Sequence, residues 1–194
     1  AIPLLFAGLM TSEIITPDLS QGGALEGNSL LYLGAKYLVF GRILPGGGED
    51  VLLNHIAWAA WAGLLVTALN LMPVGQLDGG HVLYGLFGKK ARLARWPVIG
   101  VLLFLAVAGA LRDTGLIDLG FGYSGWLLWV MLIFFLGRYN APVLDEITGL
   151  DGPRKALGVV MLVVFLLIFI PSPLTIYGPD AQDLLTAMLP SWLF

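Results

Sequence analysis

Four apolar segments follow one another in this chain of 194 residues and limit what it can fold into. They cover residues 51–72, 96–111, 123–137 and 157–170. A helix needs about 20 apolar residues to cross a bilayer, so segments of this kind favour membrane helices. Only 12% of the residues are charged, about half of the roughly 25% that is typical of soluble domains. We therefore expect an all-α, polytopic membrane protein with about four full transmembrane helices.

The shorter apolar segments predict elements that do not cross the bilayer by themselves. Residues 1–10 are apolar but too few to span, and they lack the basic start of a signal peptide, so they predict the end of a truncated transmembrane helix. Residues 29–40, which include Lys36, predict an interfacial or re-entrant helix. The amphipathic tail, residues 180–194, predicts an interfacial helix. We expect residues 1–194 to form a single membrane domain.

Charge distribution and cysteine content exclude several classes of protein. The chain has no cysteine, which excludes disulfides and thiolate metal sites. Its few basic residues form no stripe, so we expect no nucleic-acid partner. If the basic loop at 88–95 is cytoplasmic, seven of the ten basic residues lie on that side, as the positive-inside rule requires. This places residues 70–81 toward the cytoplasmic face. We also expect the membrane to be a bacterial inner or plasma membrane.

One segment, residues 70–81 with the sequence NLMPVGQLDGGH, interrupts the helix expected over 51–87. Pro73 has no N–H and keeps the preceding residue out of the helical region. Three glycines permit backbone geometries that other residues avoid; they are Gly75, Gly79 and Gly80. In a bilayer, non-helical backbone survives only inside protein or beside a water-filled cavity. An extended piece here would offer its free amides and carbonyls to a ligand strand.

Asp78 is the residue in this segment that most calls for a function. A carboxylate in or near a membrane helix costs about 3 kcal/mol, and its natural partner without a nearby base is a metal ion or a proton. The alternative is an N-cap and turn at the membrane surface. Asn70 could position a substrate carbonyl or brace the broken backbone. His81 could share a helical face with Asp78 as a ligand or serve as an interfacial anchor, and His55 is expected to be interfacial or to pack between helices.

The string ALNLMPVGQLDGGHVLYGLFG resembles the second signature of the site-2 protease family, the intramembrane zinc metalloproteases of peptidase family M50. That signature couples an Asn and a Pro to a Leu-Asp-Gly core. The segments HIAWAAWAGLLVTALN and GWLLWVMLIFFLGRYNAPVLD resemble the bacterial and plastid branch of the family. The resemblance runs from about residue 30 to residue 173.

The resemblance implies a role for each residue of the motif. In that family, two His of an HExxH helix and the Asp of the Leu-Asp-Gly motif hold the zinc, and the Glu of HExxH activates a water. Asp78 would be the third zinc ligand, and Asn70 would position the substrate or the reacting carbonyl. Pro73 and the three glycines would shape the backbone. Two imidazoles and one carboxylate leave a fourth zinc position open, as catalytic sites require.

The chain departs from the family pattern in one respect, because it contains no HExxH. Its two histidines, His55 and His81, are 26 positions apart. The resemblance therefore implies the C-terminal part of a protease that cleaves membrane-spanning peptides, with the HExxH segment upstream in the same gene or on a partner chain. Alone, this chain should be inactive. The alternative is a non-catalytic, protease-like subunit of a larger membrane complex. A transporter is a third possibility, since broken helices with an Asp also occur at transport sites.

Overall fold

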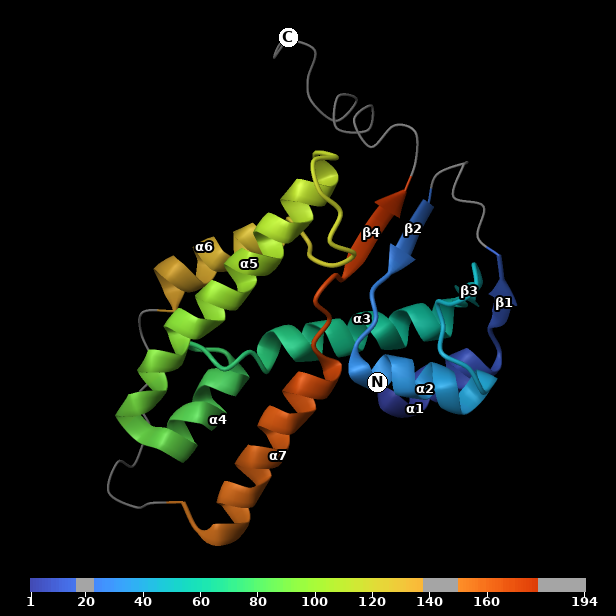
Figure 1. Ribbon diagram of the computed structural model, residues 1–194. Helices are drawn as coiled ribbons and strands as arrows, with labels where there is room; N and C mark the ends of the chain where they lie inside the picture. Colours follow the sequence, from blue (N-terminus) through green and yellow to red (C-terminus); the bar gives the residue numbers. More distant parts are fainter. Residues whose placement is uncertain (17–22, 138–149, 178–194) are drawn as a thin grey trace.

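Helices make up most of the computed structural model, which describes residues 1–16, 23–137 and 150–177 (Figure 1). The helices are α1 (Ile2–Met10), α2 (Leu30–Phe40), α3 (His55–Asn70), α4 (Asp78–Phe87), α5 (Arg95–Asp113), α6 (Trp126–Leu136) and α7 (Gly152–Ile168), with a 3-10 helix, η2 (Gly88–Ala94). The strands are β1 (Glu13–Ile15), β2 (Gly23–Glu26), β3 (Asp50–Leu52) and β4 (Leu174–Tyr177). The predicted tail helix over 180–194 lies outside the described residues.

The four strands correct the expectation of an all-α chain. They form two antiparallel two-stranded sheets, β1 with β3 and β2 with β4. Because β3 occupies part of the expected 51–72 helix, α3 begins only at His55. Its N-cap is Asn54, whose side chain accepts a hydrogen bond from Ala57 N at 2.9 Å. Strands of three or four residues are too short to show an alternating hydrophobic pattern, so the sequence does not reveal them.

The first hydrophobic core lies between α1, α2, α3 and the end of α7. The backbones of α1 and α3 approach closely, because a Cβ added to Gly8 would lie 2.5 Å from the backbone nitrogen of Ala57. Small residues at such contacts are typical of helices that pack in membranes. This core fixes α3, and with it the position at which α3 ends.

A buried ion-pair cluster joins β2, α2 and β3 at the start of α3. The Lys36 side chain is fully buried; its Nζ lies 2.9 Å from Asp50 Oδ1 and 3.3 Å from Glu26 Oε1. Tyr32 donates its hydroxyl proton to Glu26 Oε1 at 2.9 Å. The opposite side of α2 is exposed, with Leu38 at its surface. Lys36 is therefore an internal tie between strands and helix, not an interfacial anchor.

The second core packs α5 and α6 side by side (Figure 1) and includes residues of the segment between α3 and α4. Trp126, at the start of α6, is buried and donates its indole N–H to the Pro171 carbonyl at 2.8 Å. Its ring stacks on Phe169 with centroids 5.4 Å apart. Residues that follow α7 thereby hold α6 in place.

The lengths of the helices bear on how the chain meets a membrane. Among the described residues, one continuous helical run, Asp78–Asp113, is long and apolar enough to cross a bilayer. The chain turns at η2, so α4 and α5 are separate helices within this run (Figure 1). Helices α2, α3 and most of α6 are apolar but shorter. Four full transmembrane helices are therefore not confirmed, and that number stays a prediction.

Candidate functional site

The chain between α3 and α4 makes consecutive turns. The last helical bond of α3 runs from Leu71 N to Thr67 O at 2.9 Å. Pro73 has no N–H to continue the pattern, and Val74 N then bonds to Met72 O at 2.7 Å. The next helix starts where His81 N bonds to the carbonyl of the residue before Asp78. The interruption is present where the sequence predicts it, but it is a compact turn and not the extended strand that would pair with a ligand.

Three glycines allow the turn to pack backbone against backbone. Gly75 has φ +60°, and a Cβ there would lie 2.9 Å from the Cα of Gly137 at the end of α6. A Cβ on Gly79 would lie 1.9 Å from the carbonyl oxygen of Leu71, and one on Gly80 would lie 2.5 Å from that of Gly75. No other residue type fits these positions without moving backbone, so the glycines set how closely α4 approaches the end of α3.

Asn70 and Asp78 stand at the two ends of this turn, and both side chains are exposed. The residues between them hold the turn in the cores, since Met72 and Val74 are buried. Neither polar side chain has a hydrogen bond or ion pair with another residue in the described part of the chain. The sequence predicts Asp78 in or near a membrane helix, and the structure places it at the start of α4 with its side chain exposed. It does not cap α4, because the N-cap residue is Leu77.

The described residues do not by themselves hold a metal ion. No group of three or more His, Cys, Asp or Glu is close enough together among them to do so. His81 is exposed one turn after Asp78. His55 stands 15 residues before the end of α3, which separates it from Asn70 by about 22 Å at 1.5 Å per residue. Asp78, a free carboxylate at a helix start, fits one ligand position of a zinc site, and the other positions need groups from elsewhere.

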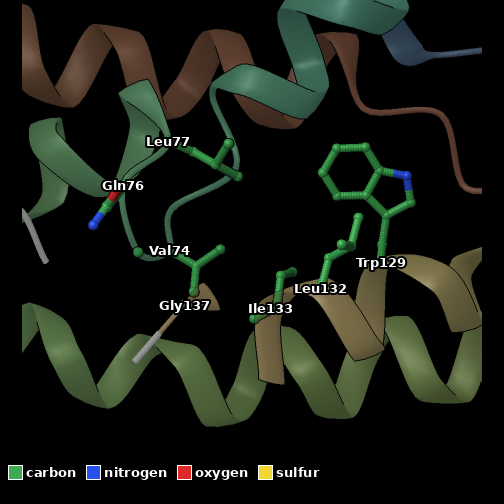
Figure 2. A pocket seen from close by; sticks show the side chains of 8 residues that line it. Val74, Gln76, Leu77, Trp129, Leu132, Ile133 and Gly137 are labelled. Atoms are coloured by element: carbon green, nitrogen blue, oxygen red, sulfur yellow. The ribbon is translucent and has the colours of Figure 1, made fainter. Parts of the chain in front are cut away.

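A cavity of about 220 Å³ lies beside the turn, between it and α6 (Figure 2). Its lining comes from four residues of the turn, three of α6 and the C-cap residue of α6: Val74, Gly75, Gln76, Leu77, Trp129, Leu132, Ile133 and Gly137. The polar end of Gln76 points away from the α6 side chains (Figure 2), so the walls that the described residues form are mainly apolar. The sequence does not reveal this cavity, because α6 is hydrophobic on all sides and no face of it stands out.

The turn lies within a segment that matches a known protein family. The family model described as peptidase family M50 matches residues 48–108, which include α3, the turn and α4. The chain is 34% identical over 155 residues to a probable chloroplastic zinc metalloprotease, EGY2 of Arabidopsis thaliana; the match covers 79% of this chain and 25% of that protein.

Two further relatives carry similar names. The chain is 34% identical over 142 residues to the probable chloroplastic zinc metalloprotease EGY3 of Oryza sativa subsp. indica, with 72% of this chain and 22% of that protein covered. It is 33% identical over 122 residues to the probable chloroplastic zinc metalloprotease EGY1 of Arabidopsis thaliana, with 62% and 20% covered. The chain thus spans about a quarter or less of the length of these curated relatives. No solved structure matches it significantly.

Proposed function

This chain belongs to peptidase family M50, as the match over residues 48–108 and the similarity to named zinc metalloproteases over most of its length indicate, and from that premise we propose that it forms the third-ligand and substrate-positioning part of an intramembrane zinc metalloprotease. The names of its relatives support a zinc-dependent peptidase. The observation that carries the proposal is the pair Asn70 and Asp78, which a buried turn holds outward without partners of their own in the described chain.

The proposal assigns roles to the two polar residues of the turn and to its proline and glycines. The Asp78 carboxylate binds the metal, and the zinc ion supplies Lewis-acid polarisation of the peptide carbonyl when it is bound. The Asn70 side chain donates its amide N–H to the substrate. Pro73 and the glycines keep these two side chains at a fixed separation, because the backbone contacts of Gly79 and Gly80 leave the turn little freedom. Such preorganisation is what a catalytic site requires of its supporting backbone.

The length of α4 supports cleavage at membrane depth. Asp78 begins α4 and the basic η2 follows its end, ten residues later. At 1.5 Å per residue α4 is about 15 Å long, half of the roughly 30 Å hydrocarbon thickness. With η2 in the headgroup layer, Asp78 would lie no deeper than about the middle of the bilayer. A membrane-spanning peptide would be the substrate, and the motif would open toward the η2 side.

The proposal also requires histidine ligands, which we assign to an HExxH segment outside these 194 residues. That segment is either part of the same polypeptide or part of a partner chain. Curated relatives about three times as long as this chain leave room for it in the same polypeptide. These relatives are named chloroplastic, so they do not favour a bacterial inner membrane over a plastid one.

Zinc analysis of the complete protease, containing this chain and its HExxH segment, tests the proposal. We expect equimolar zinc and peptide cleavage in the wild type, and loss of both in Asp78→Ala. Asp113→Ala is the matched control, because Asp113 is an exposed carboxylate at the far end of α5; it should keep both. Zinc that is unaffected by Asp78→Ala would overturn the proposal. A zinc-free wild type that purifies in fixed stoichiometry with other membrane subunits would support the alternative, a non-catalytic protease-like subunit.

A further inference from the structure

The cavity between the turn and α6 has walls that packing holds in place on both sides. On the α6 side, Ile133 is buried in the second core, and the indole of Trp126 anchors the start of the helix to Pro171. On the other side, the buried Val74 holds the turn. One end of the cavity is bounded where Gly75 and Gly137 meet backbone to backbone. A cavity with such walls exists before a ligand arrives, and preformed apolar pockets are typical binding sites.

Size and lining define what the cavity can take. Its volume is about 220 Å³, and an apolar cavity of about 150 Å³ is already large enough for benzene. Among the residues that the structure describes, no charged side chain contributes to the lining. Trp129 and Leu132 keep part of their surface exposed, the latter 38%, so a ligand can still contact them. The best occupant is therefore one large aliphatic or aromatic side chain, of the size of leucine or phenylalanine.

The position of the cavity relative to Asp78 indicates where that side chain comes from. Leu77 lines the cavity and is the residue directly before Asp78. A peptide whose carbonyl lies at a metal ion held by Asp78 would therefore have a side chain within reach of the cavity. We propose that this cavity, walled by Trp129 and Leu132, is a specificity pocket that selects a large apolar side chain close to the cleaved bond of the substrate. The inference rests on the proposed proteolytic function and adds its side-chain preference.

Cleavage of a peptide series by the complete, zinc-loaded protease tests this preference. The series carries Ala, Leu, Phe or Asp in turn at each position around the cleaved bond. At one position, we expect kcat/KM for Leu or Phe to exceed that for Ala by about tenfold or more, as apolar pockets of this kind achieve. Leu132→Trp fills the cavity and should abolish this preference by lowering kcat/KM for the Phe peptide, with the Ala peptide little changed.

Two further variants separate pocket filling from loss of folding. Leu128→Trp makes the same change on α6, but Leu128 is 59% exposed and does not line the cavity, so it should keep the wild-type preference. Trp129→Ala removes atoms from the wall and should shift the preference toward side chains larger than phenylalanine. An unchanged preference in both Leu132→Trp and Trp129→Ala would overturn the pocket, while zinc-dependent cleavage in the same samples would show that the proposed function survives.

A measurement that does not depend on cleavage completes the test. A photo-reactive phenylalanine analogue at position 132 should cross-link to peptides that carry Phe at the selected position, and much less to the matching Ala peptides. Cross-links that reach only lipid acyl chains would identify the cavity as a lipid site and overturn the proposal. Because this result does not require catalysis, it decides on the pocket even if the proposed proteolytic function is wrong.

Discussion

At the scale of single residues, Lys36 stands out in the described chain as a buried cation that needs buried counter-charges. Its ammonium group is fully buried and lies between two carboxylates, those of Glu26 and Asp50. Its Nζ also lies 4.5 Å from the centre of the Tyr32 ring. From the sequence, a lysine within an apolar stretch predicts only an interfacial helix. The sequence does not show that Glu26 and Asp50 pair with it, because these residues lie in strands 10 and 14 positions away.

Removal of the Lys36 charge should therefore destabilise the fold severely. Lys36→Met leaves the carboxylates of Glu26 and Asp50 buried without their cation, and breaking a buried pair in this way costs about 3–5 kcal/mol. Arg42→Met is the matched control, since it breaks the exposed pair with Glu49, which is worth less than about 1 kcal/mol. Chemical unfolding in detergent micelles gives both free energies of unfolding. Equal losses in the two variants would show that the cluster does not hold β2, α2 and β3 together.

The same cluster should make stability depend on pH. Burial raises the pKa of the Glu26 carboxyl above its ordinary value of 4.5, and the opposing attraction of Lys36 is the smaller effect. The folded state thus holds this proton more tightly than the unfolded state. Its contribution to stability is fully present below about pH 4.5 and is lost as the pH rises through the folded-state pKa. Glu26→Gln cannot titrate, so the wild type should lose stability relative to this variant as the pH rises above 4.5. Parallel unfolding curves at all pH values would contradict this.

At the scale of elements, the junction of α3 and α4 depends on backbone contact more than on side chains. Gly79→Ala would place its new methyl group 1.9 Å from the Leu71 carbonyl oxygen, so α4 has to move away from α3. We expect a loss of about 1–3 kcal/mol in the free energy of unfolding, together with weaker zinc binding, because Asp78 moves with α4. Gly100→Ala in α5 is the control: nothing lies within 4 Å of the added group. That variant should be as stable as the wild type or slightly more stable. Equal free energies of unfolding in Gly79→Ala and Gly100→Ala would contradict the close contact between Gly79 and the Leu71 carbonyl.

At the scale of the whole molecule, the sequence predicts helices and the motif better than it predicts how they assemble. The segment predicted at 96–111 is helical over Arg95–Asp113, because a long apolar run between breakers leaves few alternatives. The break at Pro73 also follows from local chemistry, because proline has no N–H to continue the helix. The sequence shows neither the short strands nor the cavity, because both depend on contacts between segments far apart in the chain. Gly75 and Gly137, which touch, are 62 positions apart.

The transmembrane arrangement can be tested by cysteine labelling, because these 194 residues contain no cysteine and an introduced thiol is the only one among them. Helix α5 has 19 residues, about 28 Å at 1.5 Å per residue, close to the hydrocarbon thickness. Lys90→Cys in η2 and Leu116→Cys beyond α5 are both at exposed positions. We expect a membrane-impermeant maleimide added to sealed vesicles to label these two variants from opposite sides, and Lys90→Cys from the cytoplasmic side.

The position of the motif follows from the same labelling experiment. His81→Cys, one turn after Asp78, should react from the side that labels Lys90→Cys, and more slowly, because reagent has to reach it at membrane depth. Labelling of Lys90→Cys and Leu116→Cys from one side would mean that α5 does not cross. In that case α4 would not descend into the bilayer from η2, and the depth that we assign to Asp78 would have no support. The crossing of α5 is therefore the premise on which cleavage inside the membrane stands.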